Sequence, residues 1–385
     1  MKKVAIICFY AGVVERGAEN LAYYLYKMLP FETKVYSKVS TGWTSAISYK
    51  EYKNWKKFIK ISKRTGFYRL LYQLEKVNPY FDVFSEDFFD VLSFAKNLLI
   101  ELKENKPDFI ININGSTVGY FLAKYRENNY VPFVSVGGAG KNITEIKNAQ
   151  VGPNVYIAQT PSMYKFIKQK VPKVNVELIA IGADLKIYDD AKSLNNEELK
   201  QLSKNTKCPI FQRPIILSTS ALQKNKRLDY LIRVVARLPQ GSLIFTSDGI
   251  DRGYLLYLGK KFLGNRFIYL GVVDKEVLPR IYKTCDVFCL PSINEPFGNV
   301  FIEAMAANKP VVADDDEDRR WIIGDAGVLT DVRSVEKIAD ALWKAYNTDW
   351  GNGPRKQAEK FSWDKIIEQY SDLIEKLSGR KGTCQ

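Results

Sequence analysis

Short apolar runs alternate with amphipathic segments along most of the chain. Apolar runs bounded by turn residues predict buried strands, and apolar residues that recur every three to four positions predict helices. In the first half, the predicted strands are residues 3–10, 80–85, 108–114, 132–136, 155–159 and 177–181. The predicted helices are residues 19–29, 88–104, 118–127 and 162–170. Strands that alternate with helices in this way predict a parallel sheet built from crossover units.

The same rhythm returns in the second half after a polar, lysine-rich segment at 189–207, which is predicted to be a linker with one surface helix. The predicted strands are residues 214–218, 243–246, 267–270, 287–290 and 310–313. A final helix over 363–377 has one apolar face. A chain of 385 residues is long enough for two cores, so the sequence predicts two α/β domains.

Two acidic residues follow the strand predicted over 287–290. Glu295 lies in a polar loop, and Glu303 is the one charged residue of a mostly apolar helix. Ligands of open parallel sheets bind outside the carboxyl ends of the strands, where this loop is expected. Gly298 would allow close backbone approach, and the N–H groups near Asn299 and Val300 would form an anion site. Taken singly, each acid also fits an ordinary solvated position.

A glycine-rich turn connects the first predicted strand to the first predicted helix. It runs from residue 11 to residue 18 and contains Arg16 and Gly17. Glycines at such a junction allow backbone approach to a phosphate, and an arginine adds positive charge. A lone turn of this kind is also compatible with a simple chain reversal.

The net charge of the chain indicates what kind of partner it binds. The chain has 57 Lys and Arg residues against 43 Asp and Glu residues and no histidine, a formal net charge of +14. This indicates an acidic partner: a phosphorylated substrate, a membrane surface or nucleic acid. Basic and aromatic residues interleave over 49–74, which predicts either a helix on an anionic membrane or a helix packed on its own domain. The residues expected at the membrane are Trp55, Lys56, Lys57, Phe58 and Lys60. No known nucleic-acid motif accompanies the segment, so nucleic acid is not an expected partner.

Cysteine usage and the N-terminal sequence predict a cytoplasmic protein. The five cysteines are odd in number and scattered, which favours buried, reduced thiols over disulfides. Cys285 and Cys289 suggest a metal pair, but without histidine or a second cysteine pair no metal site is expected. Residues 1–10 lack a secretory signal pattern, and no apolar run is long enough to cross a bilayer. These features are also compatible with a protein bound peripherally to the cytoplasmic face of the membrane.

The stretch from Asp286 to Asp316 resembles the signature of retaining glycosyltransferases of family 4. Glu295 and Glu303 match its E-x7-E pattern, and the following A-M-A-x-x-x-P-V-V also matches. Gly17-Ala18-Glu19 and Gly182-Ala183-Asp184 resemble the family's first loop and its passage to the second domain. The resemblance implies the GT-B fold, with two Rossmann-like domains facing across a cleft. It implies an acceptor domain over 1–188, completed by 363–385, and a donor domain over 189–362.

The resemblance also implies roles for individual residues. Glu303 would bind the ribose hydroxyls, and Glu295 the donor sugar. Lys226, Lys224, Gly17 and Arg16 would contact the diphosphate, with Glu295, Lys226 and Arg16 in the catalytic set. The backbone at Phe297, Gly298, Asn299 and Val300 would support the sugar and phosphate, and that at Val272 and Val273 the base. No cofactor or metal is implied.

Two positions depart from the family pattern. Ala221 stands where an arginine usually helps to clamp the diphosphate, and Lys224 or Arg227 could replace its charge. Gly137 stands where many members have a histidine beside the reacting sugar. On the acceptor side the sequence offers Gly137, Gly138 and Lys141.

The predicted function is transfer of a sugar from a UDP- or GDP-sugar to a hydroxyl acceptor, with a lipid or lipid-linked glycan at a membrane surface as one acceptor class. A nucleotide-sugar epimerase of the same fold and a non-catalytic nucleotide-binding protein are the alternatives.

Overall fold

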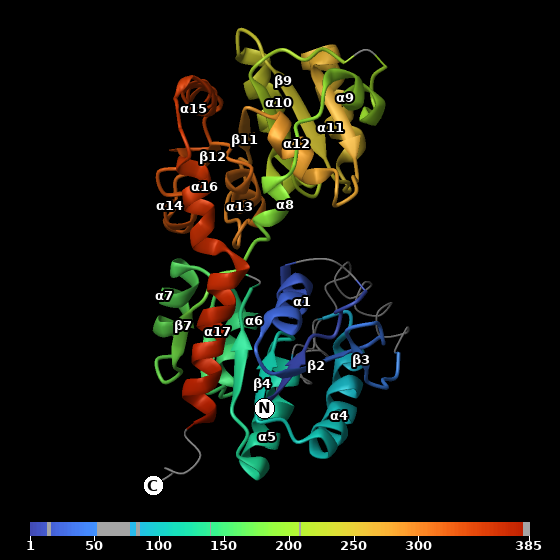
Figure 1. The fold of residues 1–385 in the computed structure, drawn as a ribbon, viewed down its shortest axis with the longest axis vertical. Coiled ribbons are helices and arrows are strands. Elements are labelled where there is room, and N and C mark those ends of the chain that lie inside the picture. The colour runs from blue at the N-terminus through green and yellow to red at the C-terminus, as the bar shows by residue number, and fades with distance from the viewer. Residues whose placement is uncertain (14–16, 52–77, 82–84, 139, 208, 380–385) are drawn as a thin grey trace. The chain divides into compact units, whose positions relative to one another are not determined.

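The computed structural model describes residues 1–13, 17–51, 78–81, 85–138, 140–207 and 209–379 (Figure 1). The chain forms two compact units. Unit 1 comprises Met1–Ile181 and Trp363–Gln385, and unit 2 comprises Gly182–Ser362. Each unit contains a parallel sheet, which confirms the predicted α/β class.

Unit 1 is built on a parallel sheet of seven strands in the order β3-β2-β1-β4-β5-β6-β7. The strands are β1 (Lys3–Ile7), β2 (Glu32–Ser37), β3 (Ser45–Ala46), β4 (Phe109–Asn112), β5 (Phe133–Val136), β6 (Val155–Ala158) and β7 (Val176–Leu178). The chain order reverses between β1 and β4, so the loops after these two strands flank the switch point of the sheet.

The strand predicted over 80–85 is wrong for its described residues. Tyr80 lies in a turn and Phe81 outside any strand, and residues 82–84 lie outside the described part of the chain. The ring of Phe81 packs against Phe88, Tyr120 and Phe121. The ring of Phe81 therefore packs a turn, and not a strand, against neighbouring helices. The strands β2 and β3 were not predicted, because their sequences carry little apolar alternation.

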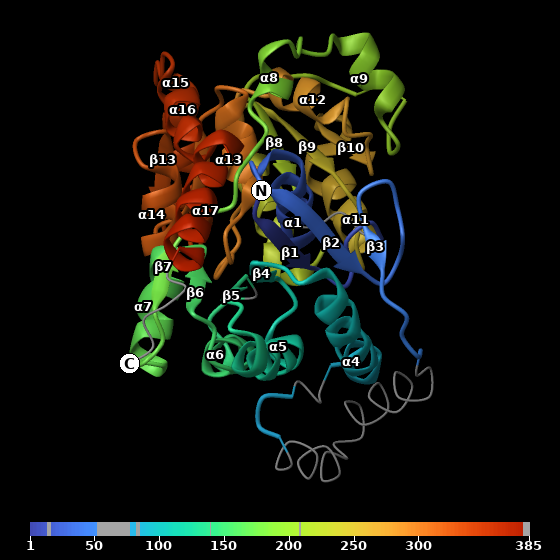
Figure 2. The same ribbon diagram turned by 60° about the horizontal axis from the view of Figure 1, so that its bottom comes forward.

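Helices cover the sheet of unit 1. They are α1 (Gly17–Met28), α4 (Phe88–Asn105), α5 (Ser116–Asn129), α6 (Ile143–Gln150), α7 (Pro161–Lys170) and α17 (Trp363–Ser378). Helices α4, α5 and α6 pack in succession along one face, and α1 packs with α17 on the other (Figure 2). Helix α6 was not predicted from the sequence, and its first turn is capped by the side chain of Asn142.

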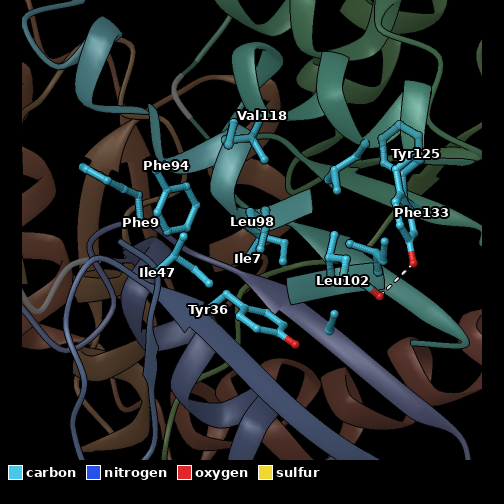
Figure 3. Close-up of a cluster of buried hydrophobic side chains, with 14 of the residues drawn as sticks. Ile7, Phe9, Tyr36, Ile47, Phe94, Leu98, Leu102, Val118, Tyr125 and Phe133 are labelled. Carbon is cyan, nitrogen blue, oxygen red and sulfur yellow. Dashed lines mark hydrogen bonds between the residues drawn. The ribbon is translucent and has the colours of Figure 1, made fainter. Parts of the chain in front are cut away.

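The core of unit 1 lies between the sheet and helices α4 and α5. Ile7 and Tyr36 contribute from β1 and β2, and Phe94 and Leu98 from α4 (Figure 3). Tyr125 of α5 is buried, and its hydroxyl donates a hydrogen bond of 2.9 Å to the carbonyl of Leu102. Its polar tip is therefore satisfied inside an apolar cluster.

The C-terminal helix α17 belongs to unit 1. The ring of Trp363 stacks on Tyr24 of α1 at 4.4 Å between centroids and 15° between planes. Further along, Lys376 pairs with Glu177 at 3.2 Å, and Glu375 pairs with Lys2. The helix thus completes a domain from which the whole of unit 2, Gly182–Ser362, separates it in the sequence.

Unit 2 is built on a parallel sheet of six strands in the order β10-β9-β8-β11-β12-β13. The strands are β8 (Ile215–Thr219), β9 (Ser242–Thr246), β10 (Phe267–Gly271), β11 (Val287–Cys289), β12 (Val311–Asp314) and β13 (Gly327–Thr330). Every one is nearly continuous in apolar residues except at its ends, as expected for a strand covered on both faces. The order reverses between β8 and β11.

The helices of unit 2 form two layers. One contains α10 (Leu228–Arg237), α11 (Arg252–Leu263) and α15 (Val335–Asn347). The other contains α8 (Lys186–Asp189), α12 (Leu278–Thr284), α13 (Asn299–Ala306), α14 (Glu317–Ile323) and α16 (Gly353–Ala358). The polar segment before β8 contains α9 (Asn196–Leu202), which is the surface helix predicted there.

Candidate active site

Two loops meet at the switch point of unit 2. One follows β8 and ends in a short 3-10 helix, Lys224–Lys226, and the other follows β11 and carries Glu295. The ammonium nitrogen of Lys226 lies 2.9 Å from Oε1 and 2.7 Å from Oε2 of Glu295. Only 14% of the lysine side chain and 11% of the glutamate side chain are exposed. The structure therefore joins two residues that the resemblance implied separately.

Glu295 is held by two further residues that sequence analysis missed. The hydroxyl of Ser292 donates to Oε2 of Glu295 at 2.8 Å, and Nη1 of Arg319 donates to its backbone carbonyl at 2.6 Å. Arg319 is buried, and its Nε lies 3.0 Å from both carboxylate oxygens of Asp316. Asp316 also caps α14. These contacts fix the loop around Glu295 before any ligand binds.

The acidic run 314–318, which begins at the last residue of β12, is partly structural. Asp314 and Asp318 are buried, and Asp316 holds Arg319. No cluster of three or more potential metal ligands occurs among the described residues.

Glu303 lies on α13 and is joined to the end of β8 by a chain of hydroxyl groups. The hydroxyl of Tyr282 donates to Oε2 of Glu303 at 2.8 Å, and it lies 2.6 Å from the hydroxyl of Thr219. Desolvation raises the pKa of Glu303, and the hydrogen bond from Tyr282 lowers it in part. Burial also raises the pKa of Tyr282 well above its usual value, so the phenol stays protonated.

Gly298 is required by the packing around it. Its φ is +85°, and a Cβ there would lie 2.5 Å from the ring of Phe301. It therefore makes room for a buried ring. No side chain caps the N-terminus of α13, so the N–H groups at Asn299 and Val300 suit an anion. The side chain of Phe297 is buried beside Phe361, so only its backbone can face a ligand.

The cations of the loop after β8 have different roles. Lys224 is exposed, whereas the guanidinium of Arg227 donates to the carbonyl of Val332 at 2.9 Å and lies over the ring of Tyr230. Arg227 is thus engaged in packing, whereas the side chain of Lys224 extends into solvent.

At the tip of β10, Val272 is 68% exposed and Val273 is half-buried. The carbonyl of the preceding Gly271 accepts a hydrogen bond from Ser247 N at 2.6 Å, which ties this tip to the end of β9.

In unit 1, Gly17 begins α1 at the end of the first loop. Arg16 lies outside the described residues, and so do Trp55, Lys56, Lys57, Phe58 and Lys60. Among the helices that the structure describes, none combines the length and the apolar composition needed to span a bilayer.

The packing around Gly137 leaves no room for a histidine side chain at this position. A Cβ at Gly137 would lie 1.8 Å from the hydroxyl of Tyr156 and 3.0 Å from Oε2 of Glu145. That hydroxyl donates to Glu145 at 2.6 Å, and Gly138 N donates to Oε1 at 3.1 Å. A hydrogen-bonded pair from β6 and α6 therefore occupies the space of the missing side chain. Lys141 is exposed on the following loop.

Comparison with known proteins agrees with this geometry. Residues 173–362 match the family model described as glycosyl transferases group 1, a segment that includes all of unit 2. An uncharacterized glycosyltransferase of Methanocaldococcus jannaschii is 31% identical over 168 residues, 40% of this chain and 43% of that protein. The sulfoquinovosyl transferase SQD2 of Arabidopsis thaliana is 27% identical over 229 residues, 52% of this chain and 43% of that protein. The chain thus spans less than half the length of these curated relatives.

Solved structures resemble the chain over nearly its whole length. Anabaena HepE in complex with UDP and glucose has a TM-score of 0.69 at 16% identity, covering 98% of this chain and 100% of that chain. Sucrose-phosphate synthase from Thermosynechococcus elongatus has a TM-score of 0.72 at 17% identity, with the same coverage. At such identities the likeness establishes the fold, and the chain has the GT-B fold that was predicted.

Proposed function

We propose that the chain, whose residues 173–362 match the glycosyl transferases group 1 family, moves a sugar from a nucleotide diphosphate sugar to a hydroxyl acceptor. The observation that carries this proposal is the Lys226–Glu295 pair at the switch point of unit 2. Ligands of open parallel sheets bind at such a point. The anion site of α13 and the carboxylate of Glu303 belong to the same crossover unit.

The donor would be bound mainly by unit 2. Glu303 has two carboxylate oxygens and can accept hydrogen bonds from both ribose hydroxyls. Lys226 and Lys224 would contact the diphosphate, and Glu295 the hydroxyls of the sugar. The backbone at Val272 and Val273 would lie along a uracil or guanine base. Complexes of HepE with UDP and with UDP-glucose have the same fold, which supports a UDP-sugar as the first donor to test.

The reaction breaks the bond between the anomeric carbon and a phosphate oxygen and forms a bond from that carbon to the acceptor oxygen. Negative charge grows on the departing diphosphate. A helix N-terminus contributes about 0.3–2 kcal/mol, whereas a typical enzyme lowers its barrier by at least about 8 kcal/mol. Lys226 and, from the first loop, Arg16 would supply much of the remaining stabilisation.

Lys226 neutralises Glu295 before the donor arrives, so the donor must share this cation. A diphosphate beside Lys226 would draw the ammonium group away from Glu295 and leave the carboxylate oxygens to the sugar hydroxyls. The proposed step retains the anomeric configuration, with attack from the face that the diphosphate leaves. The acceptor proton passes to a phosphate oxygen, so the step needs neither a histidine base nor a metal ion.

The acceptor would be bound by unit 1, near Gly138 and Lys141. A lipid or lipid-linked glycan on an anionic membrane is the acceptor class that we favour, because the basic and aromatic segment at 49–74 suits such a surface.

The test combines donor binding with turnover. UDP-, GDP- and ADP-sugars are screened by thermal shift, since a ligand that binds the folded state raises the melting temperature. Release of the nucleoside diphosphate is then measured with EDTA present, for the wild type, Lys226→Ala and the control Lys356→Ala. We expect stabilisation by one nucleotide class and slow donor hydrolysis that falls at least about a hundredfold in Lys226→Ala only.

Three outcomes would contradict the proposal. Conversion of the donor sugar to an epimer without acceptor would establish an epimerase. Stabilisation by nucleotides without hydrolysis or transfer would establish a binding protein. Inversion at the anomeric carbon, seen by NMR of the first product, would exclude the retaining step.

A further inference from the structure

The outward side of α11 carries large apolar and aromatic side chains. Ile250, Tyr254 and Tyr257 are 91%, 51% and 61% exposed. Tyr254, Tyr257 and Lys261 recur at helical spacing along one side of the helix, and Ile250 lies in the turn just before it, while the opposite side of the helix is buried. We call the exposed set, completed by Lys260, the α11 surface: Ile250, Tyr254, Tyr257, Lys260 and Lys261.

All charged side chains of this helix are positive. Helix α11 contains Arg252, Lys260 and Lys261 and no acidic residue. Arg252 is bonded to Asp248 at 2.9 Å, whereas neither lysine forms an ion pair with any described residue. The ammonium group of Lys261 lies 5.9 Å from the ring centroid of Tyr257. The two lysines are therefore available to an anion outside the protein.

Aromatic rings continue the surface toward α10. Phe262 is 39% exposed, its centroid lies 5.7 Å from the ammonium group of Lys261, and the guanidinium of Arg233 lies 5.3 Å from it. Two cations thus lie near the ring of Phe262. Within unit 2, helix α11 packs on α10 and β10 through its opposite, buried side.

We propose that the α11 surface docks the protein on an anionic lipid bilayer. Tyrosine suits the headgroup region because its ring is apolar and its hydroxyl is polar. The exposed Ile250 would enter the apolar boundary, and the lysines would contact lipid phosphates, as in interfacial helices of soluble enzymes. The tyrosines would also suit a protein interface, but lysine is depleted there, so the two lysines favour lipid phosphates as the partner.

This surface is separate from the membrane contact predicted over 49–74, which lies in unit 1. It is also separate from the residues proposed to bind the donor, so it can be changed without altering them.

The test is sedimentation of the full-length protein with vesicles of phosphatidylcholine, alone or mixed with phosphatidylglycerol, at low and high salt. The variants are Lys260→Gln/Lys261→Gln and Tyr254→Ser/Tyr257→Ser. The matched charge control is Lys356→Gln/Lys360→Gln, which removes two exposed lysines from the same unit. The aromatic control is Tyr130→Asn, because Tyr130 is 80% exposed and its φ of 57° suits asparagine.

At low salt we expect the Lys260/Lys261 variant to bind anionic vesicles roughly thirtyfold more weakly, which corresponds to about 1 kcal/mol for each basic residue. High salt should shrink this difference, because salt screens exposed charges. The tyrosine variant should be weaker at both salt concentrations, and both controls should bind like the wild type.

Three results would overturn the proposal. In the first, both variants bind anionic vesicles within twofold of the controls, which would mean that another segment of the protein binds the lipid. In the second, the wild type binds neutral vesicles as tightly as anionic ones. In the third, the wild type is a dimer in solution that the tyrosine variant converts to monomers, which would make the α11 surface a protein interface.

Discussion

The ammonium nitrogen of Lys226 contacts both carboxylate oxygens of Glu295, although the two residues are 69 positions apart. Both side chains are largely buried, so each charge depends on the other for compensation. The pair connects the loop after β8 to the loop after β11, and it is the contact on which the proposed donor site depends.

Breaking this pair should reduce stability. We expect Lys226→Met to lower the free energy of unfolding by about 1–3 kcal/mol, because it leaves a desolvated carboxylate without its cation. The double variant Lys226→Met/Glu295→Met should recover part of that loss, which a double-mutant cycle in urea measures as a coupling of at least about 1 kcal/mol.

The exposed pair Lys124–Glu127 serves as the matched control for this cycle. Both of its side chains are 56% exposed, so its coupling should stay below about 0.5 kcal/mol. Equal coupling in the two pairs would show that burial of Lys226 and Glu295 has no energetic consequence.

Glu303→Gln should separate stability from binding. Because desolvation raises the pKa of Glu303 above its unfolded value, the protonated form is favoured by folding. This contribution is present at low pH and is lost as pH rises through the folded pKa, so the charged form costs stability at neutral pH. The glutamine variant should therefore melt at or above the wild-type temperature at pH 7 and should show no advantage at acidic pH.

The same variant should bind the donor at least about tenfold more weakly, since charge-assisted hydrogen bonds to the ribose are lost. Calorimetry of donor binding at pH 7 measures this. A variant that melts lower at neutral pH, or that binds the donor as well as the wild type, would contradict the role of Glu303.

Restoring a side chain at Gly137 should harm the fold. A Cβ there would lie 2.5 Å from Cζ of Tyr156, a buried ring that cannot move aside. We expect Gly137→His to lower the free energy of unfolding by about 3 kcal/mol or more. Thermal unfolding measures the loss.

The neighbouring Gly138→Ala is the control, because its Cβ would meet only the side chain of Gln159, at 3.3 Å. It should change stability by less than about 1 kcal/mol. If Gly137→His folds as well as this control, Tyr156 and Glu145 do not fill the position.

Gly298→Ala should destabilise unit 2 through both strain and overlap. Its φ of +85° disfavours alanine, and the Cβ would meet the ring of Phe301. We expect a loss of about 1–3 kcal/mol, measured by chemical unfolding. Gly353→Ala, at an open position at the start of α16, should be neutral or stabilising by up to about 1 kcal/mol.

The buried cysteines should resist thiol reagents. Cys8, Cys285 and Cys289 are buried free thiols, which agrees with the reduced state predicted from the sequence. Burial raises the pKa of Cys285 to about 12, and burial together with the charge of Glu19 raises the pKa of Cys8 to about 12. Folded protein should therefore leave these three thiols unmodified near neutral pH, as peptide mass mapping after alkylation would show. Their rapid labelling in native buffer would contradict this burial.

The local pattern of the sequence was sufficient to predict most of the elements and the parallel sheets. Apolar runs such as 287–290 must be buried on both sides, and the Asn-Lys-Pro sequence after α13 must end a helix. Asn308 indeed has a φ of +60°. The E-x7-E spacing likewise placed one acid on the loop after β11 and the other on α13. These features depend on neighbouring residues, which is why they could be predicted.

The contacts that complete the site depend on the crossover connections, which bring distant residues together. Nothing near Glu303 in the sequence indicates that Tyr282 and Thr219 would hold it, and nothing near Glu295 indicates Arg319. At Gly137 the sequence showed only a missing side chain, whereas packing of β6 and α6 against β5 filled its space with Tyr156 and Glu145. Residue types and spacing thus determined which groups could act. Tertiary packing decided their partners, because the distance between loops is set by the order of strands in the sheet.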